Sequence, residues 1–201
     1  MISFARTRFR AFAAPLFTVA AVALVAGAVA AADPHARFSS ATAYTGAPDL
    51  SLTLSMIVAG GGLAHFDSTK LVGTLAGPNT KAEVAALTKK FGAANVKSFL
   101  TVFNFVVSDS LKIVTEKKVP LPSKPAPSPS DGKALAAALY TAGVNSESKY
   151  NVEVMLDKLV SHPIHDTVMD DIDAKFGQKA DANYYIVLTQ AMTDLKAAYK
   201  L

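Results

Sequence analysis

After residue 50, apolar residues recur every three or four positions along most of this chain, and glycine or proline interrupts the pattern at short intervals. This spacing places the apolar side chains of each segment on one face of a helix. The longest segment, from Asn95 to about Lys118, carries an apolar stripe wide enough for a central helix packed on more than one side. We therefore predict an all-α fold, a single-domain helical bundle of about six to seven helices over residues 50–201.

Some helix boundaries follow from local signals. Thr80 and Glu83 have the spacing of a capping box, and Gly92 follows where a helix would end. Pro163 suits the first turn of a helix, and we expect Asp181 to be the N-cap of the last one. Residues 50–59 are harder, because leucines alternate with serine or threonine as in a strand. A lone strand would have no partner, so a helix is favoured there too.

The first 32 residues have the organisation of a cleaved signal peptide. Arg6, Arg8 and Arg10 precede an almost wholly apolar run over 11–32, which ends in small residues that fit an A-x-A cleavage site. We expect a secreted or periplasmic protein with no stable membrane span after cleavage. The alternative is a retained anchor, since the run approaches the roughly 20 residues that cross a bilayer. We expect residues 33–49, broken by glycine and proline, to form a flexible N-terminal arm.

Charge and cysteine content exclude several classes of protein. Three of the 20 Lys and Arg residues lie in the signal and all 16 acidic residues lie after it, which leaves 17 basic against 16 acidic side chains. Arg37 is the only arginine after the signal, and phosphate recognition favours arginine, so we predict no nucleic-acid partner. Without cysteine, the chain has neither disulfides nor thiolate metal ligands, and it cannot hold a covalent c-type haem.

Residues 119–130 contain five prolines. Proline at this density excludes helix and strand and favours an extended connector. Neither side of the segment has enough residues for a secure independent core, so we interpret it as a Pro-rich surface loop within one domain.

The strongest candidate metal site is the sequence His162-Pro163-Ile164-His165-Asp166, followed by Asp170. Two imidazoles three residues apart can share a divalent ion such as zinc or copper, with the carboxylates of Asp166 and Asp170 as oxygen ligands. The competing interpretation is structural. The same acids are spaced as the solvent face of a helix and lie near its N-terminus, where the helix dipole favours negative charge.

His65 is the second candidate, as an axial ligand of a non-covalent haem b. It follows Gly60-Gly61-Gly62 between two predicted helices, and aromatic residues at helical spacing would supply pocket walls. Those aromatics are equally suited to the core, and His65 would then cap a helix or face water.

Three functional hypotheses remain open. The first is an exported helical binding or interaction module without catalysis of its own, whose partner is an unidentified protein or small-molecule ligand. The second is a periplasmic haem- or metal-binding protein that uses His65 or the His162/His165 pair. The third is a hydrolase. No G-x-S-x-G, Walker or H-E-x-x-H motif occurs in the chain, so nothing in the sequence names a reaction.

Overall fold

The computed structural model describes residues 46–144 and 149–201, and this part of the chain is helical, as predicted. The described helices are α1 (Leu50–Ala59), α2 (Ser68–Ala76), α3 (Thr80–Phe91), α4 (Ala93–Glu116), α5 (Gly132–Gly143), α6 (Val152–Val160), α7 (His162–Phe176) and α8 (Gln178–Tyr199), with a 3₁₀ turn at Gly77–Asn79. An isolated bridge between Val144 and Tyr150 is the only β pairing among these residues. The predicted signal peptide over 1–32 and most of the predicted arm lie outside the described residues.

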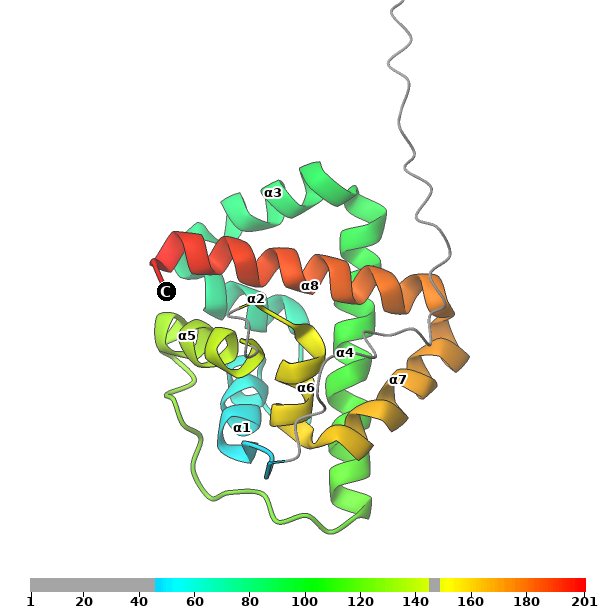
Figure 1. Ribbon diagram of the computed structural model, residues 1–201. Coiled ribbons are helices and arrows are strands. Elements are labelled where there is room, and N and C mark those ends of the chain that lie inside the picture. Colours follow the sequence, from blue (N-terminus) through cyan, green and yellow to red (C-terminus); the bar gives the residue numbers. More distant parts are fainter. Residues whose placement is uncertain (1–45, 145–148) are drawn as a thin grey trace, which may run out of the picture. The chain divides into compact units, whose positions relative to one another are not determined.

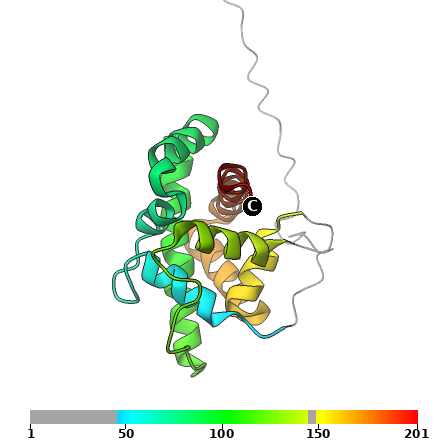
Figure 2. The same cartoon turned by 90° about the vertical axis from the view of Figure 1, so that its left-hand side faces the viewer.

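The core is built around α4, which α8 crosses steeply and α7 flanks (Figure 1). Viewed after a quarter turn, α8 lies end-on above α5 with α3 beside it (Figure 2). Phe99 and Phe103 of α4 pack against Tyr184 of α8, each with its ring centroid 5.9 Å from that of the tyrosine. The two elements are therefore held together by stacked and edge-on aromatic rings.

Within the described residues, α4 is the one helix whose length and composition would allow it to cross a membrane. Half of its most apolar 18-residue window is buried against the rest of the domain. This burial is typical of the central helix of a bundle, which is apolar on more than one side. The prediction of a central helix from Asn95 to about Lys118 is correct to within two residues at each end.

Two of the predicted N-caps are wrong. Thr80 does not act as an N-cap: its hydroxyl donates hydrogen bonds to the carbonyl oxygens of Gly73 and Gly77, because the preceding 3₁₀ turn brings both within reach. Asp181 does not cap α8, which begins three residues earlier at Gln178, and its side chain is buried in the first turn. Asp67 caps α2, since its carboxylate accepts from the Thr69 amide.

Three helix pairs meet at a single residue. Gly92, Ser161 and Gly177 join α3 to α4, α6 to α7 and α7 to α8, with φ of 85°, 84° and 81° and ψ of 150°, 147° and 157°. Positive φ is accessible to glycine without steric cost. Ser161 adopts the same conformation with a side chain present, and it lies between the two helices that carry the candidate metal residues.

Residues 119–130 form neither helix nor strand, and the segment is not a free spacer. The Ser55 hydroxyl of α1 donates to the Pro127 carbonyl, and the Ala126 amide donates to the carbonyl of Ser51. Leu121 packs against the core from the other end of the segment. The segment is therefore held by hydrogen bonds to α1 near Pro127 and by apolar packing against the core at Leu121.

Candidate metal centre

The corner at Ser161 turns the start of α7 back onto the end of α6. Asn151 is the N-cap of α6, and its side-chain oxygen accepts from the amides of Glu153 and Val154. Its buried face is apolar except for Asp157, which is only 3% exposed. Because the corner consists of one residue, His162 and His165 in the first turn of α7 reach the Asp157 carboxylate.

A single oxygen of Asp157 contacts both imidazoles. Asp157 Oδ1 lies 3.1 Å from Nδ1 of His162 and 2.8 Å from Nδ1 of His165. One potential ligand atom from each of the three side chains lies within 4.8 Å of the other two, and this is the only such group of three or more among the described residues. The Nε2 atom of each imidazole also has a polar neighbour. Nε2 of His165 lies 2.9 Å from the Tyr185 hydroxyl, and Nε2 of His162 lies 3.4 Å from Oδ2 of Asp166.

The electrostatics of the cluster favour an ionised Asp157 and a protonated His162. Burial by itself raises the pKa of Asp157, but the hydrogen bonds from His165 and His162 outweigh burial and bring this pKa below its usual value. The hydrogen bond to Asp157 raises the pKa of His162, against the effect of its own partial burial, and the nearby Asp166 and Glu153 act in the same direction. The carboxylate is therefore ionised at neutral pH and available as an anionic ligand.

Two of the three separations in the cluster are close to those around a small metal ion, and the third is within 4.8 Å. With Zn–N and Zn–O bonds of about 2.0–2.1 Å, adjacent ligands of a tetrahedral zinc ion lie roughly 3.3 Å apart. The two Asp157–histidine separations are 3.1 and 2.8 Å, so an ion requires shifts of a few tenths of an ångström at these contacts. Metal-ligating histidines usually donate their second N–H to a carboxylate or another oxygen. Asp166 and the Tyr185 hydroxyl lie where such acceptors are needed.

The structure brings together part of the predicted ligand set. His162 and His165 meet at Asp157, whereas Asp166 approaches only the outer nitrogen of His162. Asp170 lies one turn further along α7, exposed to solvent and outside the group of three. Sequence reasoning missed Asp157. Its signal was an acid on the apolar face of a short helix, five residues before the first histidine.

His65 lies in the loop between α1 and α2 and is exposed. It lines none of three cavities in the described part of the chain, those around Leu111, Lys90 and Glu83. An axial haem ligand needs an apolar cavity next to the imidazole. The surroundings of His65 therefore lend no support to the haem hypothesis.

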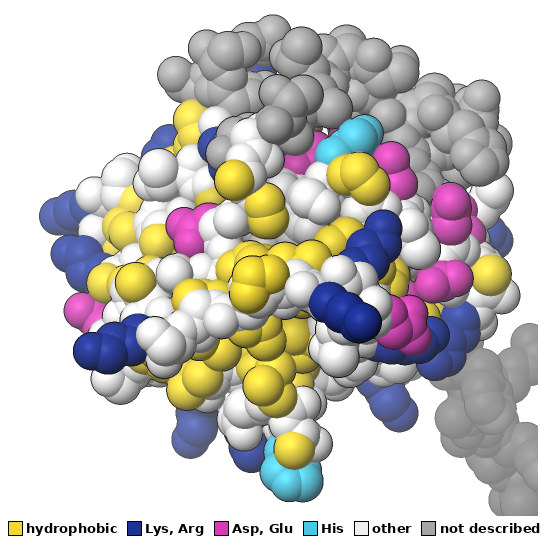
Figure 3. Space-filling view, turned by 90° about the horizontal axis from the view of Figure 1, so that it is seen from below, with side chains coloured by type: hydrophobic (Ala, Val, Ile, Leu, Met, Phe, Trp, Pro, Cys, Tyr) yellow, Lys and Arg dark blue, Asp and Glu magenta, His cyan; other side chains and the backbone are white. Residues whose placement is uncertain are grey.

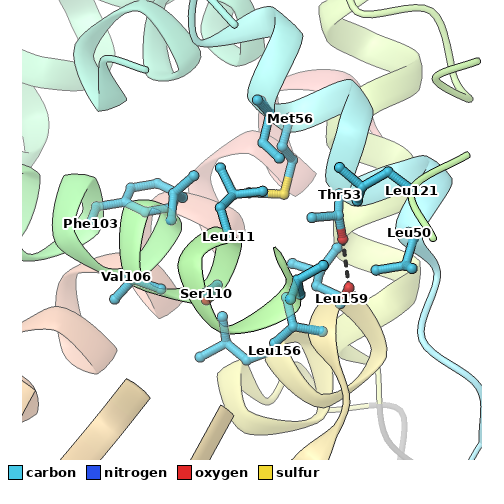
Figure 4. Close-up of a pocket in the computed structure, with 14 residues that line it drawn as sticks. Leu50, Thr53, Met56, Phe103, Val106, Ser110, Leu111, Leu121, Leu156 and Leu159 are labelled. Carbon is cyan, nitrogen blue, oxygen red and sulfur yellow. Dashed lines mark hydrogen bonds between the residues drawn. The ribbon is translucent and has the colours of Figure 1, made fainter. Parts of the chain in front are cut away.

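A face formed by α1, the end of α4 and residues 119–130 gathers apolar side chains ringed by charged ones (Figure 3). Beneath it lies an apolar cavity of about 30 Å³, whose lining includes Met56, Leu111 and Leu159 (Figure 4). In its wall, the Thr53 hydroxyl donates to the carbonyl oxygen of Leu159 at 2.6 Å. A space this small holds little more than one water molecule, so we attribute it to core packing between α1, α4 and α6.

Comparisons with protein-family models, with curated proteins and with solved structures find no match to this chain. The fold and the cluster thus define a helical domain with a buried carboxylate between two imidazoles at a helix corner.

Proposed function

We propose that this chain is a metal-binding protein that holds a divalent ion, of the zinc or copper type, between Asp157, His162 and His165. The observation that carries the proposal is the convergence of three potential ligand atoms, two nitrogens and one oxygen, within 4.8 Å of one another. Imidazole and carboxylate ligands suit zinc and copper. The positions of Tyr185 and Asp166 support the proposal further, since each lies beside the nitrogen that would not bind metal.

The same geometry limits what the ion could do. The Asp157 and His165 side chains are 4% and 3% exposed, whereas that of His162 is 45% exposed. The centre would therefore lie at the edge of the core with one side towards solvent. Three protein ligands leave a fourth position for water or an external ligand, as in zinc sites that are not purely structural. Bound metal would require both imidazoles to carry their proton on Nε2, from which His165 would donate to Tyr185.

A purely structural role for the cluster is the competing interpretation. In that case each histidine donates from Nδ1 to Asp157, and the Tyr185 hydroxyl donates to Nε2 of His165. The carboxylate would then fasten the corner between α6 and α7 without any ion. The two interpretations use the same atoms and differ in whether a metal replaces the protons on Nδ1, so binding has to be measured directly.

The test is a titration of the metal-stripped full chain with Zn²⁺ by calorimetry, and with Co²⁺ by visible absorption. We expect one Zn²⁺ per chain, with Co²⁺ giving the absorption bands of a low-coordinate nitrogen and oxygen site. His162→Gln and Asp157→Asn should abolish binding, and Tyr185→Phe should weaken it by roughly 10-fold, as for other outer-shell partners. His162→Gln matters most, because the exposed position of its side chain makes it the safest change for folding.

Two matched controls accompany these variants. His65→Ala removes an exposed histidine outside the cluster, and Asp170→Asn removes an exposed acid of the same helix. Both should bind Zn²⁺ as the unchanged protein does, with identical far-ultraviolet circular dichroism. Stoichiometric binding that survives in His162→Gln, or no binding by the unchanged folded protein, would overturn the proposal.

We also propose that the chain acts as an exported binding protein without catalysis of its own. The basic start, the apolar run over 11–32 and the small residues at its end support export. The test is expression of the full chain in a bacterial host, followed by fractionation and N-terminal sequencing. We expect a mature protein that begins near Asp33 in the exported fraction, and an uncleaved chain in the membrane fraction would contradict the proposal.

A further inference from the structure

A cleft of about 390 Å³ lies beside the candidate metal centre, between α3, α8 and the start of α6. Cavities that hold small molecules have volumes of about 300–1,000 Å³, so this cleft is large enough for a small organic molecule. Its lining consists of Lys90, Phe91, Tyr150, Asn151, Val152, Tyr185, Ile186, Thr189 and Gln190. Tyr185 belongs to both places, because its ring lines the cleft while its hydroxyl contacts His165.

The walls of the cleft are aromatic and fixed in position. Tyr150 stacks on Tyr140 with ring centroids 5.5 Å apart, and its hydroxyl donates to the Met155 sulfur at 2.9 Å. Phe91 packs against the core from the end of α3. Ile186 is 51% exposed, an unusual exposure for a large apolar residue on a core helix. These surfaces are apolar, partly uncovered and suited to the face of a flat ring.

A positively charged side chain, that of Lys90, also lines the cleft. Among the described residues that line the cleft, Lys90 is the only charged one. Its Nζ donates to Oε1 of Gln190, whose amide nitrogen in turn donates to Asp194, and it lies 5.5 Å from the centroid of the Phe91 ring. These contacts place the ammonium group at the edge of the cleft, where it remains exposed to solvent. An anion would find its counter-charge here, next to an aromatic surface.

We propose that this cleft binds a small aromatic carboxylate, with its ring against the aromatic walls and its carboxylate paired with Lys90. The apolar walls favour an aromatic ring as the ligand. Among the described lining residues there is one positive charge and no negative one, which favours an anionic group on that ring. The proposal does not depend on the metal centre, since none of the three proposed metal ligands lines the cleft.

The probe is benzoate, with benzamide as the uncharged compound of the same shape. Binding to the full chain is followed by ligand-detected magnetic resonance and calorimetry in the presence of a chelator, so that metal binding plays no part. A ligand of this size binding one such site should have a dissociation constant on the order of 1 mM, and benzamide should bind roughly 10-fold more weakly.

Lys90→Gln should weaken benzoate binding to the level of benzamide, and Ile186→Glu should abolish it by placing a negative charge in the cleft. Both side chains are exposed, so both variants should fold. Lys89→Gln, a change to an exposed neighbour outside the lining, should bind as the unchanged protein does. Equal affinity for benzoate and benzamide, or full affinity in Lys90→Gln, would overturn the proposal.

Discussion

At the residue scale, Ser161 is the position where the chain departs most from local preference. Its φ of 84° and ψ of 147° lie in a region that residues other than glycine occupy at a cost of about 1–3 kcal/mol. The two equivalent corners of the fold use Gly92 and Gly177. The strained serine immediately precedes His162, and backbone strain of this kind is common where side chains are held for function.

We predict that Ser161→Gly raises the free energy of unfolding by about 1 kcal/mol, because relief of the strained φ exceeds glycine's entropic cost. Gly92→Ala and Gly177→Ala are the matched controls. An added Cβ at either glycine has no neighbouring atom within 4 Å, so any loss of stability reports the backbone conformation alone. Urea denaturation of the metal-free proteins measures all three changes. A destabilised Ser161→Gly would show that the hydroxyl, and not the backbone, matters at this corner.

Glu83 leads to a prediction about pH. One carboxylate oxygen is buried without a hydrogen-bond partner among the described residues. Burial, together with repulsion from Asp194, raises its pKa from 4.5 to about 7. The folded state therefore favours the neutral acid. Its stabilising contribution is complete below about pH 4.5, and it is lost as the pH rises through about 7.

Glu83→Gln keeps the side chain neutral at every pH. We predict a gain in the free energy of unfolding on the order of 1 kcal/mol at pH 8, a figure already reduced for solvent screening. At pH 4.5 the gain should vanish, because the glutamate is then protonated in the folded state. Denaturation at both pH values, with Glu116→Gln at the exposed end of α4 as the control, provides the measurement. A gain of equal size at both pH values would mean that charge is not its cause.

At the scale of elements, α2 and α5 approach so closely that one glycine decides their contact. A Cβ on Gly132 would lie 1.9 Å from the Thr74 carbonyl oxygen, which belongs to the backbone and cannot move aside as a side chain can. Gly73, in the middle of α2, has room instead, since the atom nearest to an added Cβ there is the Thr80 methyl group at 4.0 Å.

We predict opposite signs for the two alanine variants. Gly132→Ala should lower the free energy of unfolding by about 2–3 kcal/mol, because the helices must separate to admit the methyl group. Gly73→Ala should raise it by about 0.5–1 kcal/mol through helix propensity. Thermal denaturation of both variants gives the comparison. If the two changes had the same sign, the close approach of α5 to α2 would not be a feature of the folded protein.

Sequence pattern predicted the elements better than their ends. The long α4 follows from one wide apolar stripe, and Gly92 and Gly177 mark two of the three corners. The Thr80 cap failed because the role of its hydroxyl depends on which acceptors the preceding turn brings near it. Gly77-Pro78 marks a turn in the sequence but does not give its 3₁₀ geometry. At the third corner, Pro163 predicts that a helix breaks near Ser161, but it does not predict how sharply the chain turns there. The dihedral angles of Ser161 are not predictable from a serine.

The prediction of the metal site was limited in the same way, because its geometry also depends on the backbone angles at Ser161. Asp166 and Asp170 are neighbours of the histidines along one helix, and helical spacing alone suggested them as ligands. Asp157 belongs to the preceding helix, and only the sharp turn at Ser161 brings its carboxylate to both imidazoles. Long-range partners of this kind depend on backbone angles at one residue, which composition and periodicity do not contain.

At the scale of the whole molecule, the candidate metal centre joins three helices. Asp157 is on α6, the two histidines are on α7, and Tyr185 of α8 contacts His165. A chain without disulfides depends on apolar packing for its stability. An ion at this junction would add links between helices that unfolding must break.

We predict that Zn²⁺ raises the melting temperature of the metal-stripped protein. An ion at 100 times its dissociation constant adds about 2.7 kcal/mol to the free energy of unfolding when it binds only the folded state. For a domain of this size, that corresponds to a rise of about 5–10 °C. Thermal melts of the full chain with and without Zn²⁺ make the measurement.

His65→Ala should show the same rise and His162→Gln should show none. Mg²⁺ at the same concentration should leave both melting temperatures unchanged, because it prefers an octahedral shell of oxygen ligands. An equal rise with Zn²⁺ in the unchanged protein and in His162→Gln would place the stabilising ion elsewhere on the chain. The comparison distinguishes stabilisation by bound metal from stabilisation by the hydrogen bonds at Ser161. A purely structural Asp157–histidine cluster would stabilise the fold equally at every zinc concentration.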